Sequence, residues 1–552
     1  MSRSRGDAKS QQVSRTEIFI CAALLLAGVA IRIALNWYQK VDSDEPQHAH
    51  VAWAWTQGLI SYRDVFDNHT PLFHILTAPL LWLVGARPEI LFWLRLAMLG
   101  LNGLTLTAVG LTTARLFSLR AALYSMVCLL WFAPFLIDLG EFRTDVLWTT
   151  AWAWAVFAVI RYRSRIWGGF LVGCLLGVCL SVSLKSILFL LVLLIAWIVQ
   201  RFVRIPDDAA PLQKPVLPML AFLAGLLLLP AALILFFGLQ GALPAMYECV
   251  VLHNLGGSSG TVGWIARISQ PLVWLLIPAL YFGFVVVPRW VSNPEHARDL
   301  VWHALIAGLY CPLLVLGWPV VTKQDFAPFY PLFGVYLGPL ILTLVAWIRQ
   351  TGVSLAPICG LLICWTLEAG YLVSREVRRR RDLLEFRELA DVIRLTDVQD
   401  YVLDPKGESI FRPRPIYPVL VLFTLTQFTR RQLSDDIPEQ LVKHQVMLAW
   451  DSDRYPQRTQ HFLQENYLRR ARLLVAGKWV APSEDGYKFS VAVPGDYVIL
   501  GNVQPVPGTL NGQPFSGRGF FTAGEYVFKP AQPQGYVLLE WVRAWERGAS
   551  SK

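Results

Sequence analysis

Residues 41–53, VDSDEPQHAHVAW, hold an unusual density of ionisable side chains. These side chains are Asp42, Asp44, Glu45, His48 and His50. A carboxylate can act as a general base toward an acceptor hydroxyl. If the stretch is helical from Asp44, His48 lies one turn further along the same face, and Asp44, Glu45 and His48 are then candidate ligands for a divalent cation. The commoner interpretation of the histidines is polar residues on a helix at the membrane interface.

Charged side chains gather at three further places. The stretch 67–72, DNHTPL, carries Asp67 and His69. The stretch 137–148, IDLGEFRTDVLW, contains Asp138, Glu141, Arg143 and Asp145, and the stretch 322–332, TKQDFAPFYPL, contains Lys323, Gln324 and Asp325. All of these stretches border strongly apolar runs, so the elements that position them are predicted to be membrane helices.

Composition supports a polytopic membrane protein. Of the 552 residues, 55% are hydrophobic and only 16% are charged, whereas a soluble protein carries about a quarter charged residues. Apolar runs long enough to cross a bilayer predict about eleven transmembrane helices. The predicted spans are 18–35, 88–111, 121–137, 146–160, 168–183, 186–200, 216–238, 271–288, 300–318, 328–347 and 353–373. The fold class is therefore mostly α, with residues 1–374 as the transmembrane domain and 37–87 as a long first outer loop.

The distribution of basic residues predicts the orientation. With a cytoplasmic N-terminus, arginines and lysines concentrate in the inner loops, and the outer loops collect acids. The three charged stretches and residues 41–53 then all face the periplasm of a bacterial inner membrane. The run SREVRRRRDLL after the last span conflicts with this map, because the odd span count places it outside. The same bias accounts for the net charge of +10 without a nucleic-acid partner.

The tail, 375–552, is polar and is predicted to be a periplasmic mixed α/β domain with a β-rich end. LLEFRELADVIRL has helical spacing, and YKFSVAVPGDYVILG, GTLNGQPFSG and GEYVFKPA resemble short strands joined by Gly, Pro and Asn-Gly turns. IYPVLVLFTLTQF is too short to span and is expected to be a buried strand. The eight cysteines form no CxxC pair, so neither a zinc site nor a disulfide framework is indicated.

Carboxylates and cations at one membrane face suit one class of reaction. A lipid-phosphate leaving group needs positive charge as its phosphate becomes more negative, and an acceptor hydroxyl needs a general base. An apolar interior accommodates the lipid chain. Sugar transfer from a lipid phosphate uses all three features.

The motifs resemble those of GT-C membrane glycosyltransferases. The stretch 42–76 is similar to the first periplasmic loop of bacterial relatives of protein O-mannosyltransferases and of the lipid A aminoarabinose transferase. These enzymes carry an Asp-Glu pair, a small-residue helix ending in glycine, and a later His-Pro-Pro-Leu or Lys-Pro-Pro-Leu element. Here these features are Asp44-Glu45, Gly58 and DNHTPL, with Thr70 in place of the first proline. GEFRTDVLW resembles the Arg-Pro-Asp element, and KQDFAPFYPL a motif that contacts the donor phosphate. Arg32 matches a recurrent arginine ahead of the acid pair.

The resemblance implies roles for individual residues. Asp44 is the expected catalytic base or acceptor-orienting acid, Glu45 is expected to support it or to help hold a cation, and Asp145 is a second active-site acid. The residues expected to bind the donor phosphate or sugar are His69, Arg143, Lys323 and Asp67. The implied partners are a polyprenyl-phosphate sugar donor, membrane lipid, and an acceptor that is lipid A, another glycan, a lipid or a protein. Such enzymes usually invert at the anomeric carbon, and metal dependence varies among them.

Three other functions compete with this hypothesis. A lipid or polysaccharide transporter places ionisable residues deep in its spans and often shows internal repeats, neither of which is evident here. An O-antigen ligase-like enzyme has its essential loop late in the chain, whereas here the informative loop is the first. A sensor with a ligand-binding tail leaves the motifs without a role.

Overall fold

The computed structural model describes residues 13–202, 216–256, 294–318, 321–351, 367, 370–371, 374 and 384–548. The chain divides into two compact units, which we call the helical unit and the mixed unit. The helical unit comprises Met1–Val41, Asp67–Leu76 and Phe92–Arg380, and the mixed unit comprises Asp42–Phe66, Thr77–Leu91 and Arg381–Lys552. The predicted domains followed chain order, whereas this division groups two segments of the first loop with the tail.

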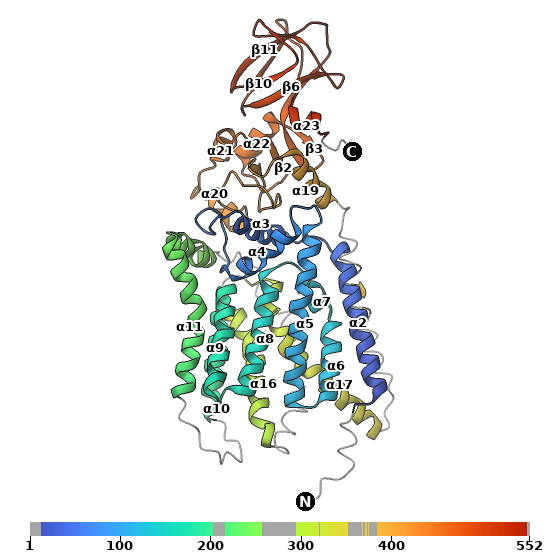
Figure 1. Cartoon of the computed structure of the whole chain (residues 1–552), viewed down its shortest axis with the longest axis vertical. Coiled ribbons are helices and arrows are strands. Elements are labelled where there is room, and N and C mark those ends of the chain that lie inside the picture. Colours follow the sequence, from blue (N-terminus) through green and yellow to red (C-terminus); the bar gives the residue numbers. More distant parts are fainter. Residues whose placement is uncertain are drawn as a thin grey trace, which may run out of the picture. The chain divides into compact units, whose positions relative to one another are not determined.

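The helical unit consists mainly of long apolar helices (Figure 1). Its main helices are α2 (Arg15–Tyr38), α5 (Ile90–Leu116), α6 (Leu119–Leu130), α7 (Ala133–Asp138), α8 (Thr144–Tyr162), α9 (Ile166–Val182), α10 (Ile187–Phe202), α11 (Val216–Leu239), α16 (Pro294–Gly317) and α17 (Phe329–Thr351). Its shorter elements are η1 (Leu184–Ser186), α12 (Leu243–Tyr247), η2 (Glu248–Leu252), α13 (His253–Gly256) and η4 (Lys323–Phe326). Helix α4 (Leu72–Val84) begins in this unit and ends in the mixed unit.

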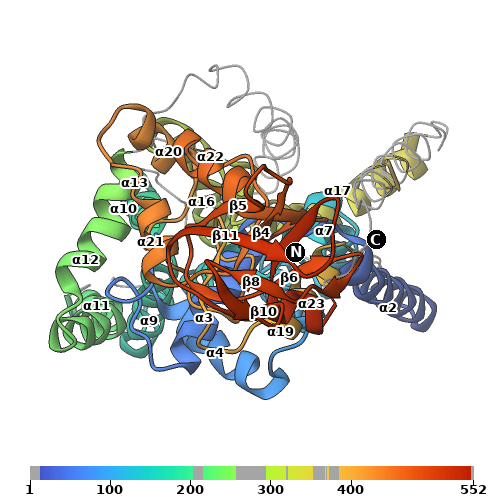
Figure 2. The ribbon, with the colours of Figure 1, turned by 90° about the horizontal axis from the view of Figure 1, so that it is seen from above.

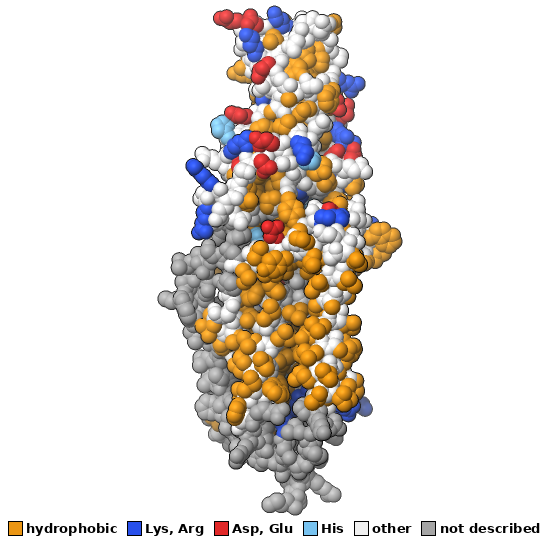
Figure 3. Space-filling model, turned by 90° about the vertical axis from the view of Figure 1, so that its left-hand side faces the viewer, with side chains coloured by type: hydrophobic (Ala, Val, Ile, Leu, Met, Phe, Trp, Pro, Cys, Tyr) orange, Lys and Arg blue, Asp and Glu red, His pale blue; other side chains and the backbone are white. Residues whose placement is uncertain are grey.

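Five of these helices, α2, α5, α11, α16 and α17, are long and apolar enough to cross a membrane, and α4, α6, α9 and α10 are shorter apolar helices. The span predicted over 121–137 is broken into α6 and α7, because Pro134 has no N–H to donate to a preceding carbonyl. The spans predicted at 271–288 and, apart from three residues, 353–373 lie outside the described residues, as does most of the arginine run. On the face drawn in Figure 3, hydrophobic side chains cover the described part of the helical unit.

Glycines set the close packing of α9 against α11, which lie side by side in Figures 1 and 2. Gly169, Gly173 and Gly177 recur every four residues along one face of α9. A Cβ atom on Gly169 would lie 2.3 Å from the carbonyl oxygen of Pro218, and one on Gly173 would lie 2.1 Å from that of Phe222. Small residues at this spacing let membrane helices approach until their backbones touch.

The mixed unit combines short helices with two sheets. Its helices are α3 (Asp44–Thr56), α19 (Leu384–Leu395), α20 (Leu422–Thr429), α21 (Ile437–Lys443), α22 (Gln457–Asn466) and α23 (Val542–Glu546). Its strands are β1 (Val402–Leu403), β2 (Leu448–Trp450), β3 (Tyr467–Arg470), β4 (Leu473–Val480), β5 (Tyr487–Val491), β6 (Gly495–Gly501), β7 (Gln504–Pro505), β8 (Gly508–Leu510), β9 (Gln513–Phe515), β10 (Arg518–Phe521), β11 (Gly524–Pro530) and β12 (Val537–Trp541).

The larger sheet has the order β1-β2-β4-β12-β6-β10, with β3 paired to β4 and β7 to β6, and the smaller has the order β5-β11-β8-β9. Only β1 and β2 pair in parallel among the described strands. The predicted Asn-Gly turn joins β8 to β9, and Asn511 and Gly512 both take the positive φ that such a two-residue hairpin requires.

The predicted strand IYPVLVLFTLTQF is wrong. Its second half forms helix α20, and its first half, 416–421, is irregular. A short apolar run has no periodicity that distinguishes a strand from a buried helix. Pro418 in the first half also has no N–H to give to a sheet.

Candidate active site

Helix α3 places two acids at its N-terminus. Asp44 and Glu45 are its first two residues, where the positive end of the helix dipole favours carboxylates. The Asp44 N–H donates to Asp42 Oδ1 at 3.0 Å, and the Asp42 N–H donates to Glu45 Oε2 at 3.0 Å. At the other end Gly58 has φ +73°, and the Leu59 N–H donates to the Ala54 carbonyl, which closes the helix in a Schellman turn. The predicted helix ending in glycine is confirmed.

Asp44 and Glu45 differ in exposure. The side chain of Asp44 is 28% exposed, whereas Glu45 is completely buried. Asp44 accepts a hydrogen bond from Nζ of Lys406, a residue of the tail that belongs to the same unit. Asp44 can therefore be reached by a substrate, whereas Glu45 fastens the turn that carries Asp44.

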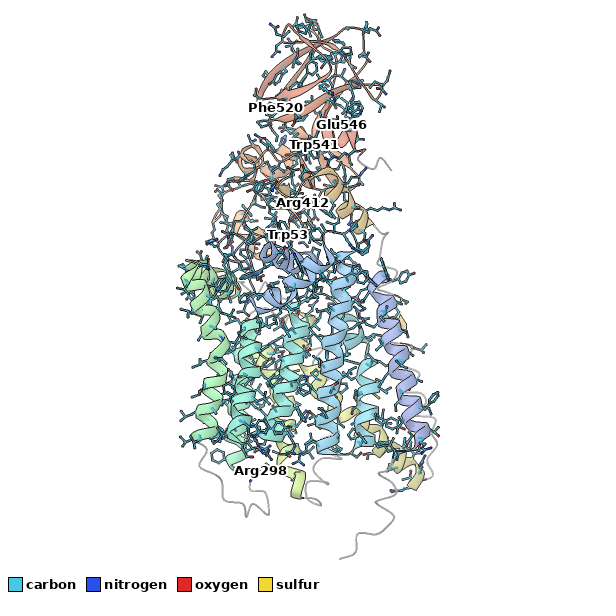
Figure 4. The ribbon with its side chains drawn as sticks, viewed as in Figure 1. Trp53, Arg298, Arg412, Phe520, Trp541 and Glu546 are labelled. Atoms are coloured by element: carbon cyan, nitrogen blue, oxygen red, sulfur yellow. The ribbon has the colours of Figure 1, made fainter. Side chains whose placement is uncertain are left out.

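Helix α3 is more deeply buried than a helix lying on a membrane would be. All residues from Glu45 to Ala54 are buried, including Trp53, labelled in Figure 4. Tryptophan is enriched at membrane interfaces, but Trp53 is a core residue. His48 is buried as well. Among the described residues, no group of three or more His, Cys, Asp or Glu side chains is arranged to hold a metal ion.

The DNHTPL element is organised around a buried carboxylate. Asp67 has no exposed surface, and its two carboxylate oxygens lie 3.3 Å from His69 Nδ1 and 2.9 Å from His74 Nδ1. Burial alone would raise the pKa of Asp67, but the charges of His74 and His69 and their hydrogen bonds lower it below the ordinary value. Asp67 therefore orients two imidazoles, of which His69, with 26% of its side chain exposed, can meet a ligand.

A further histidine is linked to this element. In α13, Asn254 Nδ2 donates to the Asn68 carbonyl at 2.8 Å. Burial, followed by the positive charge of His69, lowers the pKa of His253 to about 4. His253 is thus neutral near pH 7.

The GEFRTD element forms a buried network of charges. Arg143 Nε donates to Asp145 Oδ2 at 3.0 Å and lies 3.9 Å from Glu141 Oε2. Gln39 Nε2 donates to Glu141 Oε1 at 3.2 Å, and Gln39 Oε1 accepts from Arg32 Nη1 at 2.7 Å. Hydrogen bonds and ion pairs therefore connect Arg32, the arginine matched by motif, to Asp145.

The KQDF element supplies two lysine pairs. Lys323 Nζ donates to Asp138 Oδ1 at 2.7 Å, and 48% of the Lys323 side chain is exposed. Asp325 is buried and accepts from Lys185 Nζ, while its other oxygen accepts from the Thr322 N–H at 2.8 Å. The exposed Lys323 is available to an anionic ligand, and the buried Asp325 anchors the turn.

The predicted site residues therefore fall into two groups. Arg143, Asp145 and Lys323 come together around segment 138–145 of the helical unit, and Phe73 beside His74 packs on Phe142 at 5.0 Å between ring centroids. Asp67 and His69 belong to the same unit. The other group, in the mixed unit, is Asp44, Glu45 and His48.

Sequence analysis missed several participants. Glu141, Asp138 and Asp325 were noted only as outer-loop acids, and the pairing of Lys185 with Asp325 was not foreseen. His74 follows DNHTPL by two residues, and a histidine at that spacing was a usable signal. No signal marked Lys406, because its turn in the tail resembles any other Pro-Lys-Gly turn.

Comparison with solved structures identifies the fold. ArnT from Cupriavidus metallidurans bound to undecaprenyl phosphate matches with a TM-score of 0.58 at 13% identity, covering 84% of this chain and 98% of ArnT. The same enzyme in the apo state matches with a TM-score of 0.60 at 15% identity, covering 83% and 97%. The chain has the ArnT fold. This confirms the resemblance to GT-C enzymes at the level of fold, and the coverage exceeds the share that residues 1–374 could supply, so part of the tail is included.

Other comparisons add little. The archaeal oligosaccharyltransferase AglB from Archaeoglobus fulgidus, solved with an inhibitory peptide and a dolichol-phosphate, matches with a TM-score of only 0.45 at 10% identity, covering 79% of this chain and 70% of AglB. No protein-family model matches the chain, and no curated protein matches it in sequence.

Proposed function

We propose that this protein transfers a sugar from a polyprenyl-phosphate-linked donor to an acceptor hydroxyl or phosphate on lipid A, another glycan, a lipid or a protein. The observation that carries the proposal is the likeness to ArnT captured with undecaprenyl phosphate, which the chain covers almost completely. The motifs of the first loop agree with this proposal, because they resemble the motifs of the group of enzymes that includes ArnT.

In the proposed reaction Asp44 is the general base. The acceptor oxygen forms a bond to the anomeric carbon, and its proton passes to the Asp44 carboxylate. The bond between the anomeric carbon and the phosphate oxygen breaks, and its electron pair leaves with the polyprenyl phosphate. Direct displacement inverts the configuration at the anomeric carbon. The 28% exposure of the Asp44 side chain, against none for Glu45, supports Asp44 rather than Glu45 as the base.

The leaving phosphate gains negative charge, which cations aimed at it stabilise. Lys323 and His69 are the partly exposed positive or hydrogen-bonding groups of the helical unit's motifs. Arg143 is nearly buried between Glu141 and Asp145, so these acids fix the direction of its guanidinium. We assign the donor phosphate or sugar to Lys323, His69 and Arg143, with Asp67 holding His69 and with Asp145 as a second acid near the sugar.

We place the reaction on the periplasmic face of a bacterial inner membrane, with the N-terminus in the cytoplasm. The asymmetry of basic residues between alternate loops supports this orientation. A reporter fused after residue 552 should be active on the periplasmic side. Cytoplasmic reporter activity would mean that the predicted number of spans, about eleven, is in error by one.

The function is tested by transfer from labelled polyprenyl-phosphate sugars to endogenous acceptors in membranes that contain the full chain. Asp44→Asn keeps the size of the side chain and removes the base, so transfer should fall by about 100-fold or more. Asp64→Asn is the matched control: Asp64 lies in the same loop and pairs with Arg63 at 2.8 Å. Absence of transfer by the wild type with every donor tested would contradict the function, and equal transfer by Asp44→Asn would contradict the role of Asp44.

A further inference from the structure

The turn after β1 is a rigid structure built on one carboxylate. Asp404 is fully buried and accepts from the Gly407 N–H at 2.6 Å, the Ser409 N–H at 2.9 Å and Arg414 Nε at 2.9 Å. Burial would raise the pKa of Asp404, but the positive charge of Arg414 and the hydrogen bonds of Ser409 lower it. A carboxylate with this many donors fixes the turn in one conformation.

The segment that follows is anchored to α19. Arg412, labelled in Figure 4, is buried, and its Nε and Nη2 donate to Oγ1 and the carbonyl oxygen of Thr396, each at 2.7 Å. Thr396 comes directly after the last residue of α19. Hydrogen bonds to Asp404 therefore fix the turn internally, and Arg412 fixes the chain after the turn to the end of α19.

This turn lies directly on α3. His50 Nδ1 is 2.9 Å from the Ile410 carbonyl. Gly407 has φ +104°, and a Cβ atom there would lie 3.0 Å from His50 Cβ and 3.2 Å from Gln47 Cα. The glycine thus serves both the left-handed backbone and the close approach to the helix. Both segments belong to the mixed unit, so the contact is internal to one compact body.

Because the turn packs on α3, Lys406 lies at the N-terminus of this helix. Only 8% of its side chain is exposed, and its Nζ donates to Asp44 Oδ1 and lies 3.4 Å from Ser43 Oγ. The tail thereby contributes a nearly buried cation to the residue that the motif marks as the base. Loss of Asp44 would leave this nearly buried ammonium without its carboxylate, which is costly.

The charged and titratable groups around this pair belong to α3, the turn before it and the turn that carries Lys406. Among the described groups these include Asp42, Glu45, His48, His50, Asp404, Glu408 and Arg414. The carboxylates of Asp42 and Glu45 add negative charge near Asp44, and Lys406 supplies a positive charge in direct contact with it.

We propose that Lys406 is a positioning residue for the transfer reaction, and that the C-terminal domain acts in catalysis by presenting it to Asp44. The inference depends on the proposed function, because it assigns Lys406 a role through Asp44. Lys406 fixes one oxygen of the Asp44 carboxylate and sets a positive charge beside it, so the carboxylate is held in one orientation toward the acceptor. The tail is therefore a working part of the active site, since it completes the surroundings of the base.

The test uses the full chain in membranes and compares Lys406→Met, Lys406→Gln and Lys406→Arg with the wild type. Removal of the charge should lower kcat about tenfold or more with a smaller change in donor KM, because Asp44 loses its fixed orientation. The acidic limb of the pH profile should move upward by about one pH unit, since a carboxylate without an adjacent ammonium binds a proton more readily. Lys406→Arg should restore most of the activity and the original limb.

The matched control is Lys488→Met, which removes a lysine of the same domain that pairs with Asp485 at 2.5 Å on β5. It should keep both the rate and the pH profile of the wild type. If Lys406→Met does not accumulate as folded protein, Lys406→Gln gives the same comparison with a polar side chain. Unchanged or increased kcat, or an unmoved acidic limb, in the neutral variants would overturn the proposal while transfer by the wild type and its loss in Asp44→Asn leave the proposed function standing.

Discussion

The guanidinium of Arg32 fills the space that a side chain on Gly140 would need. Its Cζ atom lies 1.6 Å from the position of a Cβ on that glycine. Arg32 is buried in α2, and through Gln39 it is connected to Glu141, the residue after Gly140. The glycine of the GEFRTD element thus admits the arginine that precedes the acid pair by a dozen residues.

Gly140→Ala should therefore destabilise the protein. The arginine must move, and overpacking of a buried position costs about 1–3 kcal/mol. The melting temperature of the purified protein in detergent measures this, and transfer activity should fall with it because Arg143 and Asp145 share the network. Gly103→Ala is the control, since nothing lies within 4 Å of a Cβ there and alanine favours the helix. Equal melting temperatures for both variants would refute the assignment.

The pair of Lys185 and Asp325 should behave as a coupled unit. Asp325 is 1% exposed, so Lys185→Met leaves a buried carboxylate without its ammonium, which costs about 3 kcal/mol or more. Asp325→Asn alone should also destabilise. The double variant should recover part of the loss, because neither charge remains to be desolvated. A double-mutant cycle on thermal stability measures the coupling, and strictly additive effects would show that the two groups act independently.

Lys323 should contribute to donor binding and little to stability. Its pair with Asp138 is half-exposed, and such pairs are worth at most about 1 kcal/mol. Lys323→Met should raise donor KM about tenfold through loss of a charged phosphate contact, with an unchanged melting temperature. Arg349→Met, in the last turn of α17, removes a cation at the end of that helix far from Lys323 and should leave KM as it is. A Lys323 variant with wild-type KM would remove this residue from the site.

Local patterns predicted much of the fold. The apolar runs became α2, α5, α8 and α11, because hydropathy over a bilayer thickness is a property of each segment alone. Helix α3, its final glycine and the Asn511-Gly512 hairpin also follow from short-range chemistry. The motifs correctly singled out Arg143 and Asp145 as neighbours, since they lie two residues apart.

Contacts between distant segments were not predictable in this way. Lys406 and Asp44 are 362 positions apart, and nothing in either segment encodes the partner. Tryptophan suits both membrane interfaces and protein cores, and only the fold shows that Trp53 is covered. The run 416–428 was taken for a strand because apolar composition does not distinguish a strand from a short buried helix.

Glu408 should make stability fall as pH rises. Burial, followed by the negative charge of Asp404, raises the pKa of Glu408 to about 7 from an ordinary value of 4.5. The folded protein then binds this proton more tightly than the unfolded chain does. The resulting stabilisation is fully present below about pH 4.5 and is lost as pH rises through about 7. Glu408→Gln stays neutral at every pH, so its melting temperature should exceed that of the wild type near pH 8 and converge with it near pH 5. Glu525→Gln, an exposed position on β11, should keep the wild-type dependence, and a Glu408→Gln curve parallel to the wild type would show that this carboxyl does not titrate in that range.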